Sequence, residues 1–186
     1  FTALLRAQHA HGSKTPILED LERQPLAYGR LVLGSLVLGA KLARMARRRE
    51  AVGILLPNVN GLAVTVFGLN ALGRIAALLN FTAGIKNLRS AARTAEIQTI
   101  VTSRRFIDTA KLDDVVAALA DTELGPGRRI RIVYLEDVRR TIGTRDKLAG
   151  VARATFARRV HARHGLTPDD PAVILFTSGT EGEPKA

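Results

Sequence analysis

Short apolar runs alternate along the chain with longer segments in which apolar residues recur every three or four positions. The short runs predict strands at residues 51–56, 75–79, 97–102, 129–135 and 172–176, after a brief strand around residues 17–18. The longer segments predict helices at residues 2–11, 27–47, 60–72, 85–95, 113–120 and 146–163. Strands that alternate with helices indicate parallel βαβ units, and runs that are apolar on both faces indicate a sheet covered on both sides. We therefore expect an α/β fold with a mostly parallel sheet and helices on both faces.

The most apolar of the helical segments is residues 27–47. Its uncharged part, residues 31–40, has ten residues, whereas a membrane-spanning helix needs about 20. We therefore expect a buried core helix. The arginines at its end, Arg47, Arg48 and Arg49, suit the negative end of a helix dipole.

The last fifteen residues, AVILFTSGTEGEPKA, combine an apolar run with a polar loop. Residues 172–176 predict a buried strand, and the loop that follows is rich in hydroxyl groups and glycine and carries a lysine. Glycines let backbone N–H groups turn toward an anion, hydroxyls add donors, and lysine adds a positive charge. The loop therefore predicts a phosphate-binding site, with a solvent-exposed Gly/Ser turn as the alternative.

The order of residues in this loop excludes the common nucleotide-binding loop G-x-x-x-x-G-K-[ST]. That motif places glycine before the lysine and a hydroxyl residue after it, where the hydroxyl binds Mg²⁺. Here Pro184 precedes Lys185 and Ala186 follows it.

The loop instead resembles the signature T-S-G-T-T-G-x-P-K-G of the adenylate-forming (AMP-binding) synthetases. The positions that match are Thr177, Ser178, Gly179, Thr180, Gly182, Pro184 and Lys185. Further segments narrow the resemblance: LNFTAG at 79–84, IVTSRRFID at 100–108, VYLED at 133–137, and Glu181 within the loop. With these, the chain looks like the ligase half of the bacterial bifunctional acyl-acyl-carrier-protein synthetase/2-acylglycerophosphoethanolamine acyltransferases.

This resemblance implies an ATP- and Mg²⁺-dependent ligase that converts a fatty acid to acyl-AMP and transfers the acyl group to acyl carrier protein. A fatty acyl-CoA ligase or another adenylate-forming enzyme is the alternative. The residues that the resemblance assigns to the ATP phosphates are Thr177, Ser178, Gly179, Thr180, Gly182 and Lys185. Glu181 departs from the pattern, because a carboxylate repels phosphate, and we expect it to point away or to pair with an arginine.

The resemblance also implies that this chain is the N-terminal part of an adenylation domain. The chain lacks an initiator Met and ends one residue after Lys185, so we expect a longer parent protein. Catalytic residues and Mg²⁺ ligands would lie downstream and the acyltransferase half upstream, and we expect no ligase activity from residues 1–186 alone. The expected location is the cytoplasm, with the parent at the inner-membrane face. With 186 residues, 46% of them hydrophobic, the chain is long enough for one core, and without cysteine it has no disulfide or thiolate metal site.

The net charge of +11 predicts an acidic partner. Arginines cluster at residues 44–49, 128–131 and 158–163, and we expect these clusters to form a docking face for acyl carrier protein or an anionic membrane surface. A non-catalytic basic module that binds nucleic acid or anionic lipid is the alternative from another class. Aromatic residues make up only 4% of the chain and no nucleic-acid-binding motif is present, so nucleic acid is the less favoured partner. An arginine-rich surface with no partner is the simplest interpretation.

Three other patterns carry residues that could support chemistry. The histidine pairs His9/His11 and His161/His164 have no nearby third ligand, so no metal site is expected. The H-x-x-x-x-D spacing of His164 and Asp169 resembles that of glycerolipid acyltransferases, but it lies in a Gly/Pro-bearing connector and is interpreted as a coincidence. Residues 80–84 follow a strand, so they are either part of a ligand site or a turn with Thr82 as the helix cap.

Overall fold

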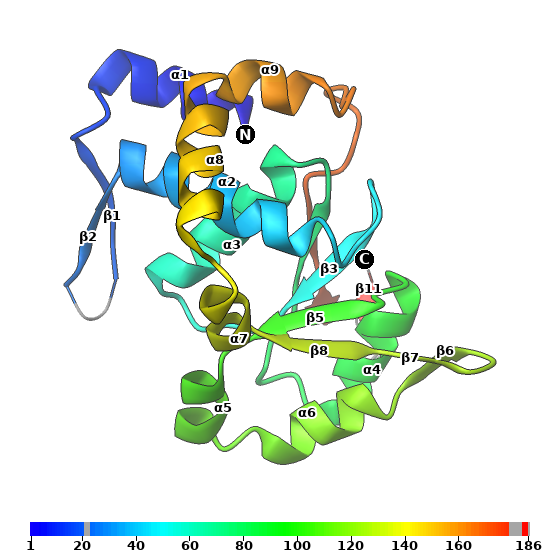
Figure 1. The fold of residues 1–186 in the computed structure, drawn as a ribbon. Helices are drawn as coiled ribbons and strands as arrows, with labels where there is room; N and C mark the ends of the chain where they lie inside the picture. The colour runs from blue at the N-terminus through cyan, green and yellow to red at the C-terminus, as the bar shows by residue number, and fades with distance from the viewer. Residues whose placement is uncertain (21–22, 179–183, 186) are drawn as a thin grey trace.

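The computed structural model describes residues 1–20, 23–178 and 184–185. Its core is a five-stranded sheet in which every neighbouring pair is parallel (Figure 1). The strands are β3 (Ala51–Ile54), β4 (Ile75–Leu78), β5 (Thr99–Thr102), β8 (Arg131–Tyr134) and β9 (Val173–Leu175). Their order across the sheet is β8-β5-β3-β4-β9. The prediction of a parallel α/β sheet is confirmed, and each strand is shorter than the apolar run that predicted it.

In the described part of the chain, helices and three small hairpins surround this sheet. The helices are α1 (Thr2–His11), α2 (Tyr28–Leu42), α3 (Asn60–Ala71), α4 (Ile85–Thr94), α5 (Arg104–Ala110), α6 (Asp113–Ala120), α7 (Leu135–Arg140), α8 (Thr144–Thr155) and α9 (Ala157–Ala162). The hairpins pair β1 (Pro16–Glu19) with β2 (Pro25–Ala27), β6 (Glu123–Gly125) with β7 (Arg128–Arg129), and β10 (Thr177–Ser178) with β11 (Pro184–Lys185).

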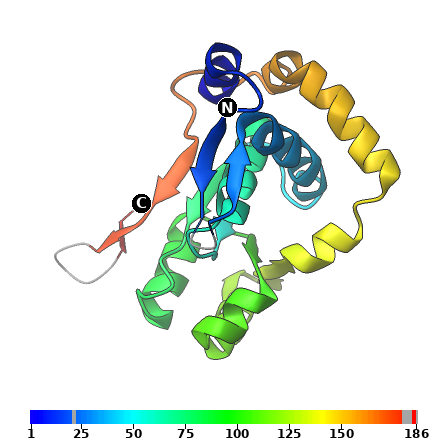
Figure 2. The ribbon, with the colours of Figure 1, turned by 90° about the vertical axis from the view of Figure 1, so that its left-hand side faces the viewer.

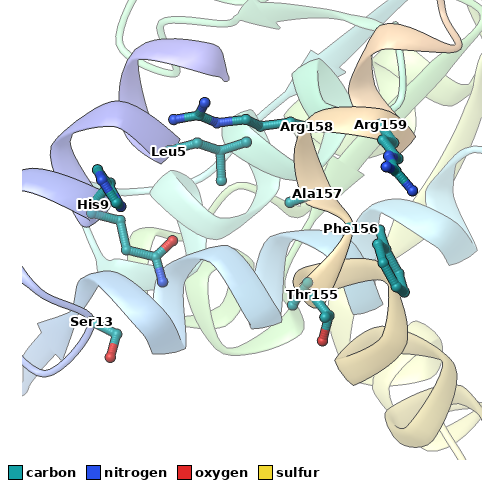
Figure 3. A pocket seen from close by; sticks show the side chains of 10 residues that line it. Leu5, His9, Ser13, Thr155, Phe156, Ala157, Arg158 and Arg159 are labelled. Atoms are coloured by element: carbon teal, nitrogen blue, oxygen red, sulfur yellow. The ribbon is translucent and has the colours of Figure 1, made fainter.

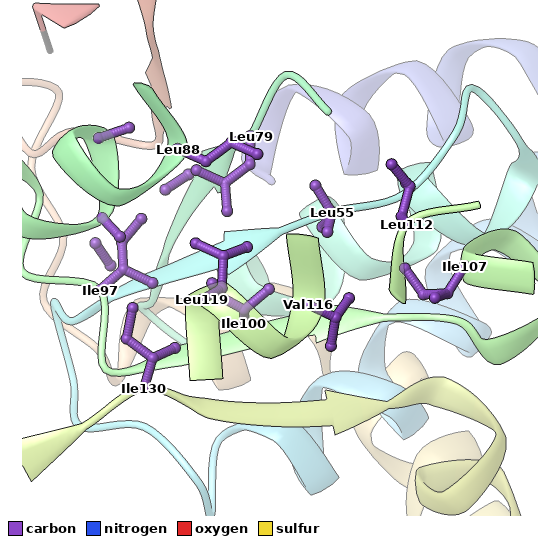
Figure 4. Packing of buried hydrophobic residues seen from close by; sticks show 14 of the residues in the cluster. Leu55, Leu79, Leu88, Ile97, Ile100, Ile107, Leu112, Val116, Leu119 and Ile130 are labelled. Carbon is purple, nitrogen blue, oxygen red and sulfur yellow. The ribbon is translucent and has the colours of Figure 1, made fainter. Parts of the chain in front are cut away.

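Helices cover both faces of the sheet, as predicted. On one face, Ile100 of β5 is buried together with Leu88 of α4 and Leu119 of α6 (Figure 4). On the other face, Val101 of β5 is buried in a cluster with Leu69 of α3, to which α2 and α7 also contribute. Because successive side chains of a strand point to opposite faces, Ile100 packs in the first cluster and its neighbour Val101 packs in the second.

Two glycines bring α2 and α3 into close contact. A Cβ atom added to Gly68 of α3 would lie 2.8 Å from the backbone oxygen of Ser35 in α2, and one added to Gly39 of α2 would clash with the backbone of Gly68. The helix backbones therefore touch directly. The predicted core helix at residues 27–47 is confirmed as the shorter α2, and Leu31 and Leu36 are fully buried in it. No helix within the described residues is both long and apolar enough to cross a membrane.

The single basic helix predicted at residues 146–163 is wrong in two respects. The segment forms two helices, α8 and α9, separated at Phe156, whose backbone (φ −110°, ψ 28°) leaves the helical region. Moreover, Leu148 and Phe156, two of the apolar residues whose spacing predicts the helix, are 66% and 55% exposed. The reason is Gly150, which packs against Val37 of α2 so closely that no Cβ atom would fit. This contact turns the Leu148 side of α8 outward.

The prediction that residues 172–176 form a strand is confirmed, but the prediction that this strand is buried is wrong. The strand β9 pairs with β4 on one side only, and its other side has no partner strand among the described residues. Val173 is consequently 39% exposed and Leu175 62% exposed. The apolar run predicts a strand correctly, but composition does not reveal that the strand lies at the edge of the sheet.

Candidate phosphate-binding site

The strand β9 leads into the predicted phosphate loop, and two sets of contacts hold its beginning. The backbone carbonyl of Ala172 accepts a hydrogen bond of 2.8 Å from the Asn70 side chain of α3 and one of 3.1 Å from the backbone N–H of Ala76. Asn70 is only 8% exposed, so this bond is shielded from water. The end of α3 and the start of β4 therefore position the strand from which the loop emerges.

The connector before β9 is held by Asp170. Its carboxylate accepts hydrogen bonds from the backbone N–H of Thr167 (2.7 Å), from the hydroxyl of Thr167 (3.1 Å) and from the Arg49 guanidinium (3.0 Å). These interactions, the bond from the Thr167 N–H foremost, hold the pKa of the Asp170 carboxyl below its ordinary value. Asp170 is thus a structural anchor between the connector and the residues after α2.

The polar residues after β9 fold back as the hairpin β10–β11. Its antiparallel register places Thr177 opposite Lys185 and Ser178 opposite Pro184, and β11 lies beside α4. The first hydroxyl residue and the lysine of the predicted site are therefore paired across one hairpin. Figure 2 shows this hairpin beyond the end of β9, at the margin of the sheet. The other predicted site residues, Gly179, Thr180 and Gly182, and the misfit Glu181, lie outside the described residues.

The turn at residues 80–84 lies at the same edge of the sheet, because β4 and β9 are parallel neighbours. The Asn80 side-chain oxygen accepts hydrogen bonds from the backbone N–H (3.0 Å) and the hydroxyl (2.8 Å) of Thr82. The residue that precedes α4 is Gly84, with φ of +82°, so the expectation that Thr82 caps this helix is wrong. Asn80 makes a local turn that uses both donors of Thr82, which favours a structural role for this segment.

A polar cluster that the sequence did not predict lies at the carboxyl ends of β5 and β8. Ser103 donates a hydrogen bond of 2.8 Å to Glu136, and Arg104 donates two to Asp137, at 2.8 and 2.6 Å. The Arg104 guanidinium also lies 4.2 Å from the centre of the Tyr134 ring. Burial of Glu136 raises the pKa of its carboxyl, but hydrogen bonds from Ser103 and from nearby backbone amides outweigh this effect and lower it. These contacts tie the start of α5 to the start of α7.

The histidines do not form a metal site in the part of the chain that the structure describes. There, no three His, Cys, Asp or Glu side chains are grouped closely enough to hold an ion. His161 lies 3.2 Å from the backbone oxygen of Ala71, and the side chain of His164 packs over Gly73. Within the described residues, no hydrogen bond or ion pair joins His164 to Asp169, and Asp170 makes the contacts of this connector. Asp170, and not Asp169, is therefore the aspartate that holds this connector in place.

The geometry defines the class of protein: an α/β domain whose polar, lysine-bearing hairpin follows an edge strand of a parallel sheet. The family model of the AMP-binding enzymes matches residues 5–186. The chain belongs to this family.

Solved structures of similar fold include VinN and two synthetases. VinN in complex with L-aspartate has a TM-score of 0.69 and 19% sequence identity, covering 100% of this chain and 46% of VinN. The O-succinylbenzoate coenzyme A synthetase MenE from Bacillus subtilis, in complex with AMP, has a TM-score of 0.68 at 15% identity, covering 98% of this chain and 40% of MenE. A fatty acyl CoA synthetase from Mycobacterium tuberculosis has a TM-score of 0.67 at 17% identity, covering 98% of this chain and 33% of the synthetase. At these identities the likeness shows the fold, and this chain spans less than half the length of each of the three proteins.

Proposed function

We propose that this chain supplies the phosphate-binding part of an ATP-dependent ligase that activates a fatty acid as its acyl-adenylate and passes the acyl group to acyl carrier protein. The observation that carries the proposal is the hairpin after β9, in which Thr177 is paired with Lys185 in a member of the AMP-binding family. Hydroxyl groups, glycines and a lysine on one short loop are suited to hold a polyphosphate.

The proposed first step is attack of a fatty acid carboxylate oxygen on the α-phosphorus of ATP. A new C–O–P linkage forms, the bond from the α-phosphorus to the bridging oxygen breaks, and pyrophosphate leaves with the electron pair. In this step, Lys185 and the hydroxyls of Thr177, Ser178 and Thr180 would stabilise the charge on the β- and γ-phosphates and hold them in line. In the second step, the thiol of acyl carrier protein attacks the acyl carbonyl, AMP leaves, and the thiol proton passes to solvent.

Mg²⁺ bound to ATP would neutralise phosphate charge and help to orient the leaving group. The described residues hold no cluster of acidic side chains for it, so the role proposed for this chain is confined to the loop. Coenzyme A is the alternative acceptor of the acyl group. One structural neighbour is by name a fatty acyl CoA synthetase, and the choice of acceptor thiol rests on the resemblance of segments such as residues 79–84 to the acyl-carrier-protein ligases.

A titration separates this proposal from a basic module that binds nucleic acid. The chain is titrated with Mg·ATP and with duplex DNA, each at low and at physiological salt. We expect saturable binding of ATP that pyrophosphate displaces, because the loop recognises the β- and γ-phosphates. Tight binding of DNA with a steep salt dependence, together with no saturable binding of ATP, would contradict the proposal, since counterion release marks a non-specific polyanion site.

A further inference from the structure

The outer side of α8 exposes large apolar side chains. Leu148 is 66% exposed and Val151 53%, and Phe156, directly after the helix, is 55% exposed. Leu148 and Val151 are three positions apart in the helix and share a face with Thr155, while Gly150 on the opposite face packs against α2. The apolar residues therefore form a stripe that points away from the protein.

Positive charge surrounds this stripe. Residues 144–165 contain six arginines and lysines and one acidic residue, Asp146, which is already paired with Lys41 of α2 at 2.8 Å. By helical spacing, Arg145 and Lys147 lie on the two sides of the stripe. Arg158 and Arg159 continue the positive charge into α9. Among the described residues, none of these four cations makes an ion pair with a carboxylate.

A cavity of about 650 Å³ adjoins the stripe where α8 meets α9. Thr155, Phe156 and Arg158 line it on one side, and Leu5 and His9 of α1 line it on the other. Figure 3 shows the Arg158 side chain reaching across toward Leu5, whereas Arg159 lies on the side of Phe156. The Arg159 guanidinium is 5.8 Å from the centre of the Phe156 ring. Cationic, hydroxyl and apolar groups thus meet within one shallow site.

We propose that this α8 surface, made of Leu148, Val151, Phe156, Arg158 and Arg159, binds anionic phospholipid membranes. Arg158 and Arg159 contact headgroup phosphates at the cavity, and the apolar side chains enter the boundary between headgroups and acyl chains. An apolar stripe flanked by arginines and lysines is the pattern of a helix that lies in a membrane interface. Nucleic acid would be attracted by the cations alone and would leave the apolar side chains without a role. The proposal is independent of the proposed ligase function, because it uses no residue of the phosphate loop.

Co-sedimentation with vesicles tests the proposal on the whole chain. The vesicles contain equal parts of phosphatidylglycerol and phosphatidylcholine, and vesicles of phosphatidylcholine alone serve for comparison. One variant combines Leu148→Ser with Val151→Ser, and a second combines Arg158→Glu with Arg159→Glu. A matched control combines Arg128→Glu with Arg129→Glu, which changes charge equally on the exposed β6–β7 hairpin, far from α8 (Figure 1). Because the substituted side chains are exposed, all variants should keep the wild-type circular dichroism.

We expect binding to the anionic vesicles only, and a loss of about tenfold or more in both α8 variants but not in the control. An equal loss in the control would overturn the proposal, because net charge would then explain binding. Loss in the charge variant alone would also overturn it, because the surface would then be a purely electrostatic site for any polyanion. Sedimentation velocity adds a further outcome: self-association that the Leu148→Ser/Val151→Ser variant abolishes would assign the stripe to a second copy of the chain. Retention of acyl carrier protein but not of vesicles would assign it to a protein partner, and either result would contradict the proposal.

Discussion

At the scale of single residues, Arg74 links the ends of several elements. Its guanidinium donates hydrogen bonds to the backbone carbonyls of Ala43 (2.7 Å) and Ala46 (2.9 Å), just after α2, and also to that of Leu72 after α3. Partial burial lowers the pKa of Arg74 from its ordinary value. A charged side chain in such a place is held by the carbonyls that it satisfies.

Replacing this side chain should therefore cost more stability than replacing an exposed arginine. We expect Arg74→Met to lower the free energy of unfolding by about 2–3 kcal/mol, because three backbone carbonyls lose their donor. The exposed Arg44 provides the matched control, and Arg44→Met should change stability by less than about 0.5 kcal/mol. Urea unfolding followed by circular dichroism measures both values. Equal midpoints for the two variants would show that the Arg74 contacts contribute little.

We expect His161 to make the stability of the fold depend on pH. Burial lowers the pKa of its imidazole. The imidazole lies near the backbone oxygen of Ala71, and its centre is 5.6 Å from the centre of the Phe1 ring. Burial and the charges of Arg74 and Arg48 lower the pKa of His164 in the same direction. The native state therefore binds fewer protons than the unfolded state in the range just below about pH 6.5.

The sign of the effect follows from these lowered pKa values. The stabilisation is present above about pH 6.5 and decreases as the pH falls below it, whereas the lowered pKa values of Asp146 and Asp170 act only below about pH 4. We expect His161→Gln to reduce the loss of stability between about pH 7 and 5. His9→Gln, at an exposed position of α1, is the control. If the free energy of unfolding of the His161→Gln protein falls between about pH 7 and 5 as steeply as that of the wild type, this origin of the pH dependence is refuted.

At the scale of elements, the contact between α2 and α3 depends on glycines that allow the helix backbones to touch. We expect Gly39→Ala to destabilise the protein by about 2–3 kcal/mol, because the new methyl group clashes with the backbone of Gly68 and the helices must separate. Gly34 lies on the same helix, but a Cβ atom there would stand 3.4 Å from the Val64 side chain, which can adjust. Gly34→Ala should therefore be neutral or stabilising by up to about 1 kcal/mol, as expected for alanine in a helix. Thermal unfolding of both variants checks the contrast.

Elements that repeat a strong hydrophobic pattern could be predicted from the sequence, and elements that depend on tertiary contacts could not. The strands β3, β4 and β5 and the helices α1, α3, α4 and α6 were all predicted close to their observed limits. The short helices α5 and α7 were missed because each has too few residues to show periodicity. Ser103, whose side chain caps α5 by accepting from the backbone N–H of Phe106, was an available signal. The break at Phe156 had no local signal, because no glycine or proline lies between residues 151 and 164.

At the scale of the whole molecule, the order of the strands decides where the phosphate loop lies, because the loop follows β9. Of the five strands of the sheet, β9 comes last along the chain, and it lies at one edge, beside β4. Asn70 and Ala76 hold its start, and Asp170 holds the connector before it. The loop could be predicted from the sequence because its residue types and order are specific. The edge position of β9 and the contacts that hold it could not, because they arise between residues far apart in the chain. The predicted site residues Thr177, Ser178 and Lys185 lie on one hairpin, and their assignment to ATP phosphates remains a proposal.

The most direct test of the central claim is the affinity of the chain for inorganic pyrophosphate, measured by isothermal titration calorimetry. If the loop holds the phosphates of ATP, Lys185→Met should weaken this affinity by about tenfold or more, because a charge-assisted hydrogen bond is lost. Lys14→Met, at an exposed position between α1 and β1, removes the same charge elsewhere and should leave the affinity unchanged. An affinity that is equal in the wild type and in Lys185→Met, or that falls equally in both variants, would contradict the claim.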